Sequence, residues 1–304
     1  MIIKSQVKTS PSLKIASGWL FVLPYLFFLL AFGIGPALYI IVISFFDTRS
    51  PTLVFNGLAN YQAVVNDFRF LDSLKNPLLF TLFWLPLMIF SVLGLALLLH
   101  ARRGRFSETM RLVYYLPGAV AGPANVLLWI FMFDPAVSPF GWFLKLFGFD
   151  GRSEVLAQAN LPMIFTIMVL FTTIGAWVVT VYTSLMSIPQ EIYEAATVDG
   201  CDAFQMARYI KIPLVSKQIL YMVVLNLALG FQLIVEPSLL YGATLGAVSS
   251  PAWSVNQLAS FYAGSLLNYG AAAAISVGLL ALSLIGVLFL VFATDFYRID
   301  DEGV

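Results

Sequence analysis

Few residues of this sequence could carry out chemistry. It contains one histidine, His100, and one cysteine, Cys201, which excludes an internal disulfide and argues against a histidine-rich metal site. A phosphate-binding loop needs the pattern G-x4-G-K-[ST], yet no Gly-Lys pair occurs in the 304 residues. The zinc-protease pattern H-E-x-x-H is absent, and no nucleophile stands beside a base. We therefore expect no catalytic site, no metal site and no ATP site on this chain.

A different kind of activity is indicated by the segment 187–217, which reads SIPQEIYEAATVDGCDAFQMARYIKIPLVSK. Pro189 suits the start of a helix, where its missing N–H costs nothing. Gly200 permits a left-handed turn, and Asp202 could cap a second helix. The segment therefore predicts a stiff helix–turn–helix that presses against another protein.

Composition indicates which elements carry this segment. Of all residues, 60% are hydrophobic and 11% are charged, and the mean hydropathy is +0.91. A soluble domain carries about 25% charged residues, so these charges are too few to cover a large soluble core. The formal net charge of zero argues against a nucleic-acid partner. An integral membrane protein is the expected class.

Six apolar segments reach the length of about 20 residues that a membrane-spanning helix needs. They cover residues 19–46, 77–99, 112–133, 161–186, 219–240 and 271–293. The predicted fold is therefore an all-α integral membrane protein with six transmembrane helices and a helix–turn–helix loop at 187–217. Its transmembrane domain covers residues 19–294, between tails at 1–18 and 295–304.

The distribution of Lys and Arg predicts the orientation, because both concentrate on the cytoplasmic side of a membrane protein. With the N-terminus inside, eleven of the sixteen fall in cytoplasmic segments and five in outer ones. We expect both termini and the loop 187–217 to be cytoplasmic, and the uncharged loop 241–270 to face outward. The outer segments 57–75 and 139–149 are either helices at the headgroup level or plain loops.

The cytoplasmic loop also carries a spaced motif, EAA-x3-G-x9-I-x-L-P, with Ile212 at the position of the Leu. The matching residues are Glu194, Ala195, Ala196, Gly200, Ile210 and Pro213, and Asp199 precedes the glycine. This motif is the signature of permease subunits of binding-protein-dependent bacterial ABC importers. The chain resembles those subunits from its first span to Tyr297.

Shorter motifs resemble the sugar-type branch of that family, and within it the first of two paired permeases. They are GLANY at 57–61, YLP at 115–117, FDP at 133–135 and YGAA at 269–272. Two features depart from the branch: YGATLG at 241–246 replaces a glycine-rich stretch, and the usual LN after the third span is missing. A polyol or a glycerol-phosphate-type solute is therefore an alternative to a sugar.

The resemblance implies a set of partners in the bacterial plasma (inner) membrane. These are a second permease, two ATPase subunits that bind ATP and Mg, and an external solute-binding protein that delivers a sugar-like substrate. In that scheme the loop 187–217 is the coupling helix. Glu194 would meet a basic group on the ATPase, and Gly200 would set the angle between the two short helices. A plainer role for Glu194 is to stabilise a helix N-terminus.

Polar residues within the apolar segments are candidates for a substrate pathway, because polar side chains in hydrocarbon are costly. Asn226 and Gly230 share one helix face, and Gln232 and Glu236 form a pair four residues apart. Thr173 is the candidate from the fourth segment. Each has a plainer alternative: Asn226 could bond a neighbouring helix, Thr173 its own backbone, and Glu236 could be hydrated at an outer helix end.

Two other classes of protein compete with a permease. An ion-coupled secondary transporter usually shows internal repeats and intramembrane charges, but no convincing repeat is visible and Glu236 is the one acid within the six segments. It would also leave the loop 187–217 unexplained. An intramembrane enzyme would need the catalytic groups that the sequence lacks.

Overall fold

The computed structural model describes residues 21–102, 104–120 and 122–293. In this part of the chain five helices are long and apolar enough to cross a membrane, and a sixth span is possible if one bent helix pair counts as one. The five are Phe21–Ile43, Phe70–Ala101, Gln158–Met186, Ser216–Ala243 and Tyr269–Phe289. The predicted class, an all-α membrane protein, is confirmed. The predicted tails 1–18 and 295–304 lie outside the described residues.

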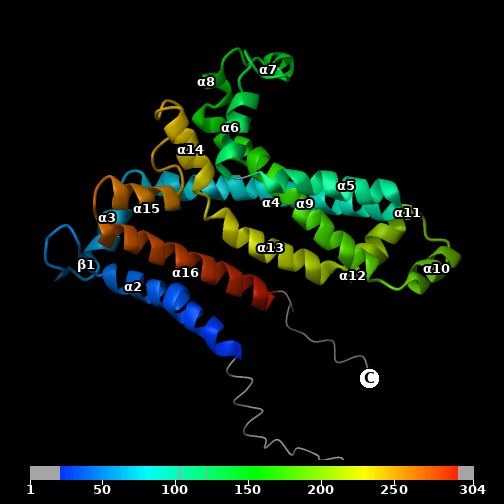
Figure 1. The fold of residues 1–304 in the computed structure, drawn as a ribbon, viewed down its shortest axis with the longest axis horizontal. Coiled ribbons are helices and arrows are strands. Elements are labelled where there is room, and N and C mark those ends of the chain that lie inside the picture. The colour runs from blue at the N-terminus through cyan, green and yellow to red at the C-terminus, as the bar shows by residue number, and fades with distance from the viewer. Residues whose placement is uncertain (1–20, 103, 121, 294–304) are drawn as a thin grey trace, which may run out of the picture.

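The spans are built from the following elements (Figure 1). The first contains a π-helical turn η1 (Leu29–Ile34) and α2 (Gly35–Ile43). Next come α4 (Phe70–Ala101), then α5 (Arg105–Tyr115), the 3-10 turn η2 (Leu116–Ala119) and α6 (Gly122–Met132). The remaining ones are α9 (Leu161–Met186), α13 (Ser216–Gly230), α14 (Val235–Ala243) and α16 (Tyr269–Ala293).

Short elements connect the spans at the two ends of the bundle. At one end lie an antiparallel hairpin, β1 (Phe46–Asp47) with β2 (Val54–Phe55), and the helices α3 (Ala59–Val65) and α15 (Val255–Gly264). At the other end lie α10 (Gln190–Val198), α11 (Ala203–Gln205), the π-helical turn η4 (Met206–Lys211) and α12 (Ile212–Leu214). An arm beside the bundle carries α7 (Gly141–Leu146), α8 (Arg152–Val155) and the turn η3 (Gln158–Asn160).

The centre of the bundle is the pair α4 and α9, which pack along each other. Their buried side chains include Phe80, Trp84, Met88, Val92 and Ala96 from α4, and Phe165, Met168, Val178, Val181 and Leu185 from α9. Helix association within a membrane depends on close packing rather than on hydrophobic burial. Gly175 illustrates this, because a Cβ there would collide with the backbone oxygen of Tyr114 in α5.

The third predicted span is wrong as a single helix. Within 112–133 the chain turns by 98° between the segments Arg105–Ala119 and Gly122–Met132. Pro117 lies in the 3-10 turn and Pro123 in the first turn of α6. Each proline removes a backbone donor and restricts the residue before it, so the α-helical ladder stops here.

The fifth predicted span, 219–240, is also interrupted, and its proline is not the residue at which the helix ends. Pro237 is the only proline in this segment, but the helix already ends at Gly230. Pro237 then lies in the first turn of α14, where a proline is tolerated. The first span also ends earlier than predicted, because Phe46 belongs to the hairpin.

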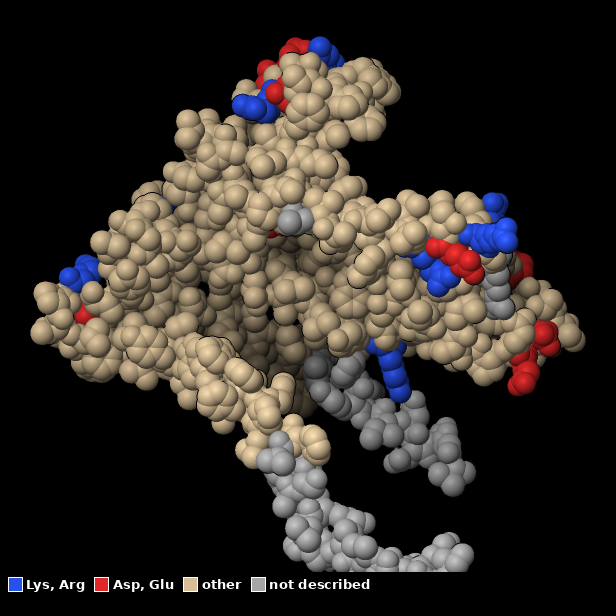
Figure 2. Space-filling view, viewed as in Figure 1, with Lys and Arg blue, Asp and Glu red and all other residues tan. Residues whose placement is uncertain are grey.

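The outer segments 57–75 and 139–149 contain helices rather than plain loops. Residues 59–65 form α3, α4 begins at Phe70, and residues 141–146 form α7. On the face shown in Figure 2, charged side chains gather at the two ends of the bundle and on the arm that carries α7 and α8. The surface between them is almost uncharged, as a bilayer requires.

Candidate functional site

The loop at 187–217 folds as its sequence predicts. Pro189 is the N-cap of α10, and Gly200 follows the helix with φ of +83°, in the left-handed region that favours glycine. The Asp202 carboxylate accepts a hydrogen bond of 2.8 Å from Gln205 N, and Gln205 Oε1 accepts one of 2.9 Å from Asp202 N. This capping box starts the second helix. The predicted helix–turn–helix is confirmed.

The loop offers an exposed face for a partner. Glu194, Ala195, Asp199 and Gly200 are exposed, whereas Ala196 packs inward with 7% of its surface accessible. Glu194 is the fifth residue of α10, and the acid in the first turn is Glu191. Stabilisation of the helix N-terminus is strongest in the first turn, which makes that plainer role a poor account of Glu194.

The second half of the loop leads back to the bundle. It passes through α11, η4 and α12 without a break between them. Ile210 in η4 is half-buried, and Pro213 in α12 is exposed in the first turn. The π-helical turn bonds residues five positions apart instead of four, which the sequence did not reveal.

Two predicted pathway residues use their polar groups within their own helices. Asn226 is buried with 1% accessible, and its Nδ2 donates a hydrogen bond of 2.7 Å to Met222 O in α13. Thr173 Oγ1 donates a bond of 2.8 Å to Val169 O in α9. The plainer alternative for Thr173 therefore matches the geometry, while Asn226 bonds its own helix rather than a neighbouring one.

Gly230 marks a close contact between two spans. A Cβ added there would lie 2.6 Å from Thr81 Oγ1 in α4, so the absence of a side chain lets α13 approach α4. Gly118 serves a similar purpose, because its Cβ would lie 2.9 Å from Thr172 O. Both positions are packing contacts in this structure.

Gln232 lies within the break of the fifth span, between Gly230 and Val235, and Glu236 follows the break. The break ends their predicted i, i+4 relation on one helix, which is a correction to the sequence analysis. Gln232 is exposed, and its backbone oxygen accepts a hydrogen bond of 3.0 Å from Asn256 Nδ2. Glu236 is half-buried in the first turn of α14.

The breaks of the third and fifth spans lie next to each other. A Cβ at Gly122, the first residue of α6, would be 3.4 Å from Val235 Cγ1, at the start of α14. Helices α6 and α14 also pack together. The non-helical backbone of two spans therefore lies at one place, and no sequence pattern predicted this pairing.

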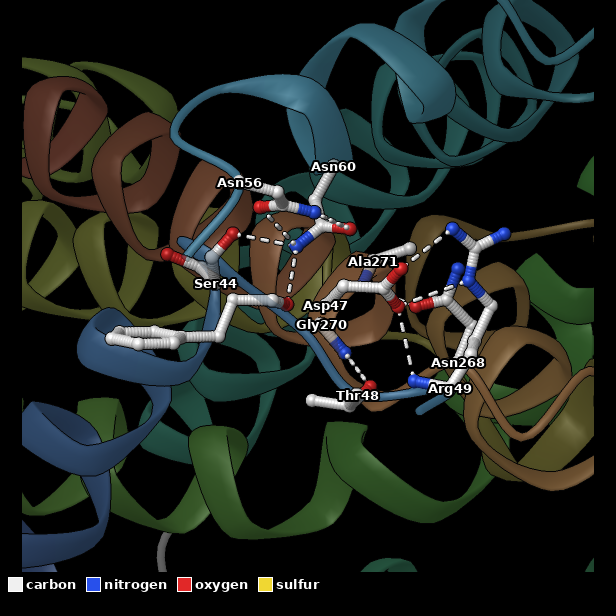
Figure 3. Close-up of polar contacts among 10 residues, drawn as sticks. Ser44, Asp47, Thr48, Arg49, Asn56, Asn60, Asn268, Gly270 and Ala271 are labelled. Carbon is white, nitrogen blue, oxygen red and sulfur yellow. Dashed lines mark hydrogen bonds and ion pairs between the residues drawn. The ribbon is translucent and has the colours of Figure 1, made fainter. Parts of the chain in front are cut away.

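A polar cluster around Asn60 lies at the end of the bundle that carries the hairpin β1–β2 (Figure 3). Asn60 is buried, and its Nδ2 donates hydrogen bonds of 2.9 Å to both Ser44 O and Phe46 O. Gly270 N donates a bond of 2.9 Å to Thr48 Oγ1, and a Cβ on Gly270 would collide with Phe46 O. The motifs 57–61 and 269–272 therefore meet in space and fasten the hairpin to the start of α16.

A second polar cluster fastens the start of α4 to α15. Arg69 Nη2 lies 2.7 Å from Asp67 Oδ2, which also accepts a bond of 2.7 Å from Tyr262 OH. The Arg69 guanidinium holds the pKa of the Asp67 carboxyl well below its usual range. Burial, and then the bond to Asp67, raises the pKa of Tyr262 to about 12. The phenol is therefore protonated at neutral pH and can donate this hydrogen bond.

Comparison with known proteins decides the family. No protein-family model matches the chain. Probable ABC transporter permease protein PH1215 of Pyrococcus horikoshii is 33% identical over 202 residues, which cover 65% of this chain and 69% of that protein. The chain belongs to the ABC transporter permeases. Its predicted family membership is confirmed, and it is a multi-pass transport component rather than an enzyme.

Two further proteins resemble this permease. The sn-glycerol-3-phosphate transport system permease protein UgpA of Escherichia coli O157:H7 is 31% identical over 180 residues, covering 58% of this chain and 59% of UgpA. A crystal structure of a bacterial alginate ABC transporter, in complex with an alginate pentasaccharide-bound periplasmic protein, superposes with a TM-score of 0.77. That match covers 96% of this chain and 98% of the other at 18% identity, and it supports the fold.

Proposed function

We propose that this permease forms half of the membrane pathway of an ATP-driven importer for a sugar or a related neutral solute. Its partners are a second permease, two ATPase subunits and an external solute-binding protein. The similarity to a glycerol-phosphate permease and the fold shared with an alginate transporter support this assignment. The ATPase subunits bind ATP and Mg, because this sequence lacks the Gly-Lys pair of a phosphate-binding loop.

The observation that carries the proposal is the exposed face of α10. Glu194, Ala195, Asp199 and Gly200 lie on a compact helix–turn–helix at the end of the bundle away from the hairpin. A short helix with small residues beside one acid can enter a groove and meet a basic group there. In this proposal α10 is the coupling helix, and Glu194 contacts the ATPase.

Orientation follows from the charges. The eleven-to-five distribution of Lys and Arg favours a cytoplasmic position for α10 and for both termini. The hairpin, α3 and α15 would then face outward, where an external binding protein delivers the solute. The location is the bacterial plasma membrane.

The paired breaks of the third and fifth spans support a position for the pathway. Non-helical backbone at membrane depth is tolerated where it is buried in protein or lines a water-filled cavity. The face at Gly122 and Val235 is therefore expected to turn toward the pathway and the second permease. Gln232 and Glu236 are the pathway candidates at these breaks, ahead of Asn226 and Thr173, whose polar groups bond their own helices.

The class of solute is argued from charge. The six predicted apolar segments contain no Lys or Arg, and a phosphate group is normally held by such cations. A neutral solute is therefore favoured. A glycerol-phosphate-type solute is the second candidate because UgpA is a relative, and in that case the second permease or the binding protein would supply the positive charge.

Co-purification from cells that express the permease with its neighbouring transport genes tests the proposal. We expect the wild type to retain an ATPase subunit, and Glu194→Lys to lose it or to lose uptake, because a like charge would replace the acid opposite a basic group. Asp72→Lys reverses an exposed charge at the other end of the bundle and should behave as wild type. Failure of any ATPase to associate, with uptake that follows a proton gradient, would refute the importer and favour a secondary transporter.

A further inference from the structure

We propose that Tyr193 and His100 are positioning residues that fasten the coupling helix α10 to the ends of α4 and α9. Motion of the ATPase would then move these two spans as one body. This inference rests on the proposed function, because it assumes that α10 receives a force from the ATPase. It assigns a transmission role to the buried face of α10, which is separate from the exposed docking face.

The first contact joins α10 to α9. Tyr193 OH donates a hydrogen bond of 3.0 Å to Leu185 O, in the last turn of α9. The last four carbonyls of a helix have no N–H donor within the helix. The Tyr193 phenol supplies a donor to one of these carbonyls in α9. Tyr193 has 7% of its surface accessible.

The second contact joins α10 to α4. His100, in the last turn of α4, has 4% of its surface accessible, and its ring centroid lies 5.4 Å from that of Tyr193. The same imidazole lies 6.4 Å from the ring of Tyr182 in α9. One histidine is therefore packed between the coupling helix and the central pair of spans.

Two cations complete the cluster. Lys211 Nζ, in η4, lies 5.4 Å from the centroid of the Tyr193 ring, so both halves of the loop 187–217 meet the same phenol. The Arg111 guanidinium of α5 lies 4.4 Å from the centroid of the Tyr182 ring. Cation–π contacts of this kind add directional attraction at low dielectric. Lys211 therefore joins the two halves of the loop to each other, and Arg111 extends the same cluster from α9 to α5.

Geometry separates this role from docking. Successive residues of an α-helix point about 100° apart, so Tyr193 faces the bundle while Glu194 faces outward. The helices that Tyr193 contacts are the ones that pack along each other in the core. A displacement of α10 is therefore passed directly to α4 and α9, whereas a loop joined only through its backbone would absorb it.

The test compares three variants of the complete transporter reconstituted in lipid vesicles. Tyr193→Ala removes the whole contact, and Tyr193→Phe removes only the hydrogen bond to Leu185. Thr197→Val is the matched control, because Thr197 Oγ1 donates to Tyr193 O within α10 and, in the described part of the chain, makes no hydrogen bond to another element. The readouts are ATPase-subunit retention and the number of solutes imported per ATP hydrolysed.

We expect Tyr193→Ala to retain the ATPase but to lower the import per ATP by about fivefold or more, the low end of measured coupling between sites. Tyr193→Phe should fall between Tyr193→Ala and wild type, and Thr197→Val should match wild type. An unchanged ratio in Tyr193→Ala would overturn the inference. If that variant does not assemble, an unchanged ratio in Tyr193→Phe would overturn it equally. Absence of ATPase from the wild type would instead refute the proposed function.

Discussion

The contact between Gly230 and Thr81 allows a sharp test of how α13 packs on α4. In Gly230→Ala the added Cβ would lie 2.6 Å from Thr81 Oγ1 and 3.4 Å from Thr81 Cγ2. An ordinary contact is about 3.5–4 Å. Thr81 cannot turn away easily, because a β-branched residue in a helix has few allowed rotamers. The helices must separate or the side chain must leave its rotamer.

The expected cost can be worked out from these distances. Overpacking of this kind costs about 1–3 kcal/mol. Alanine is favoured over glycine in a helix interior by about 1 kcal/mol, and less at Gly230, the last residue of α13. We therefore expect Gly230→Ala to lower the free energy of unfolding by about 1–2 kcal/mol.

A second substitution should reverse most of this loss. Thr81 Oγ1 is buried and has no hydrogen-bond partner among the described residues, so Thr81→Ala removes a group that contributes little. It also removes both atoms nearest the new Cβ. The double variant should recover about 1–2 kcal/mol relative to the sum of the single variants, within the range for residues in contact.

The assay is unfolding of the purified permease by SDS titration in mixed micelles, for the four members of the cycle. Additive effects of the two substitutions would refute the packing account. Transport measurements add an independent check on the earlier pathway prediction for Gly230. If Gly230 touched the solute, Gly230→Ala would raise the KM for uptake, and Thr81→Ala would not restore it.

Two further predictions concern acidic residues. Asp67→Asn should lower the thermal midpoint at pH 7, because it breaks the charge-assisted bonds to Arg69 and Tyr262. The pKa of Asp67 is lowered in the folded state. The difference in thermal midpoint between wild type and Asp67→Asn should therefore persist at pH values above the ordinary pKa of 3.8 and shrink as the pH falls below it. A difference in midpoint that grows on acidification would contradict this. Glu236→Gln should reduce uptake without loss of ATPase binding, and unchanged uptake would remove Glu236 from the pathway.

The helix–turn–helix of the loop 187–217 was predictable because the residues that determine it act on the backbone next to them. Pro189, Gly200 and Asp202 each act on the backbone beside them, through a fixed φ, a positive φ and a side-chain cap. Such effects depend on a few neighbouring residues, so the order of helix, turn and helix could be predicted before the fold was known. The hydropathy of the spans is local in the same sense. This explains why five of the six predicted segments lie in long apolar helices, although the bend in the third segment was not predicted.

The pathway residues were harder to predict because their roles depend on neighbours distant in sequence. Gly230 looked like a possible cavity position, yet Thr81 occupies the space beside it. Asn226 looked available, yet its amide finds an acceptor one turn back at Met222. A hydropathy pattern records that a residue is polar or small, but it does not record which atom lies opposite.

The polar cluster around Asn60 shows the same limit for motifs. GLANY and YGAA were recognised separately, some 200 residues apart in the sequence. The buried amide of Asn60 donates to two carbonyls of the turn that leaves the first span. Gly270 is required because Phe46 O and the Asn60 amide leave no room for a Cβ there. The two motifs form a single contact, which only the fold reveals.

The continuous and the broken spans suit different parts of transport. α4 runs for 32 residues and α9 for 26, and each has at its end a contact with α10. The third and fifth spans instead are interrupted side by side, where Gly122 meets Val235. An unbroken helix transmits displacement along its axis, because its backbone bonds hold its length. An interrupted span changes direction at the break, where few backbone bonds resist bending. In the proposed importer, α4 and α9 would therefore carry the motion of α10, and the breaks near Gly122 and Val235 would be the places where the bundle bends.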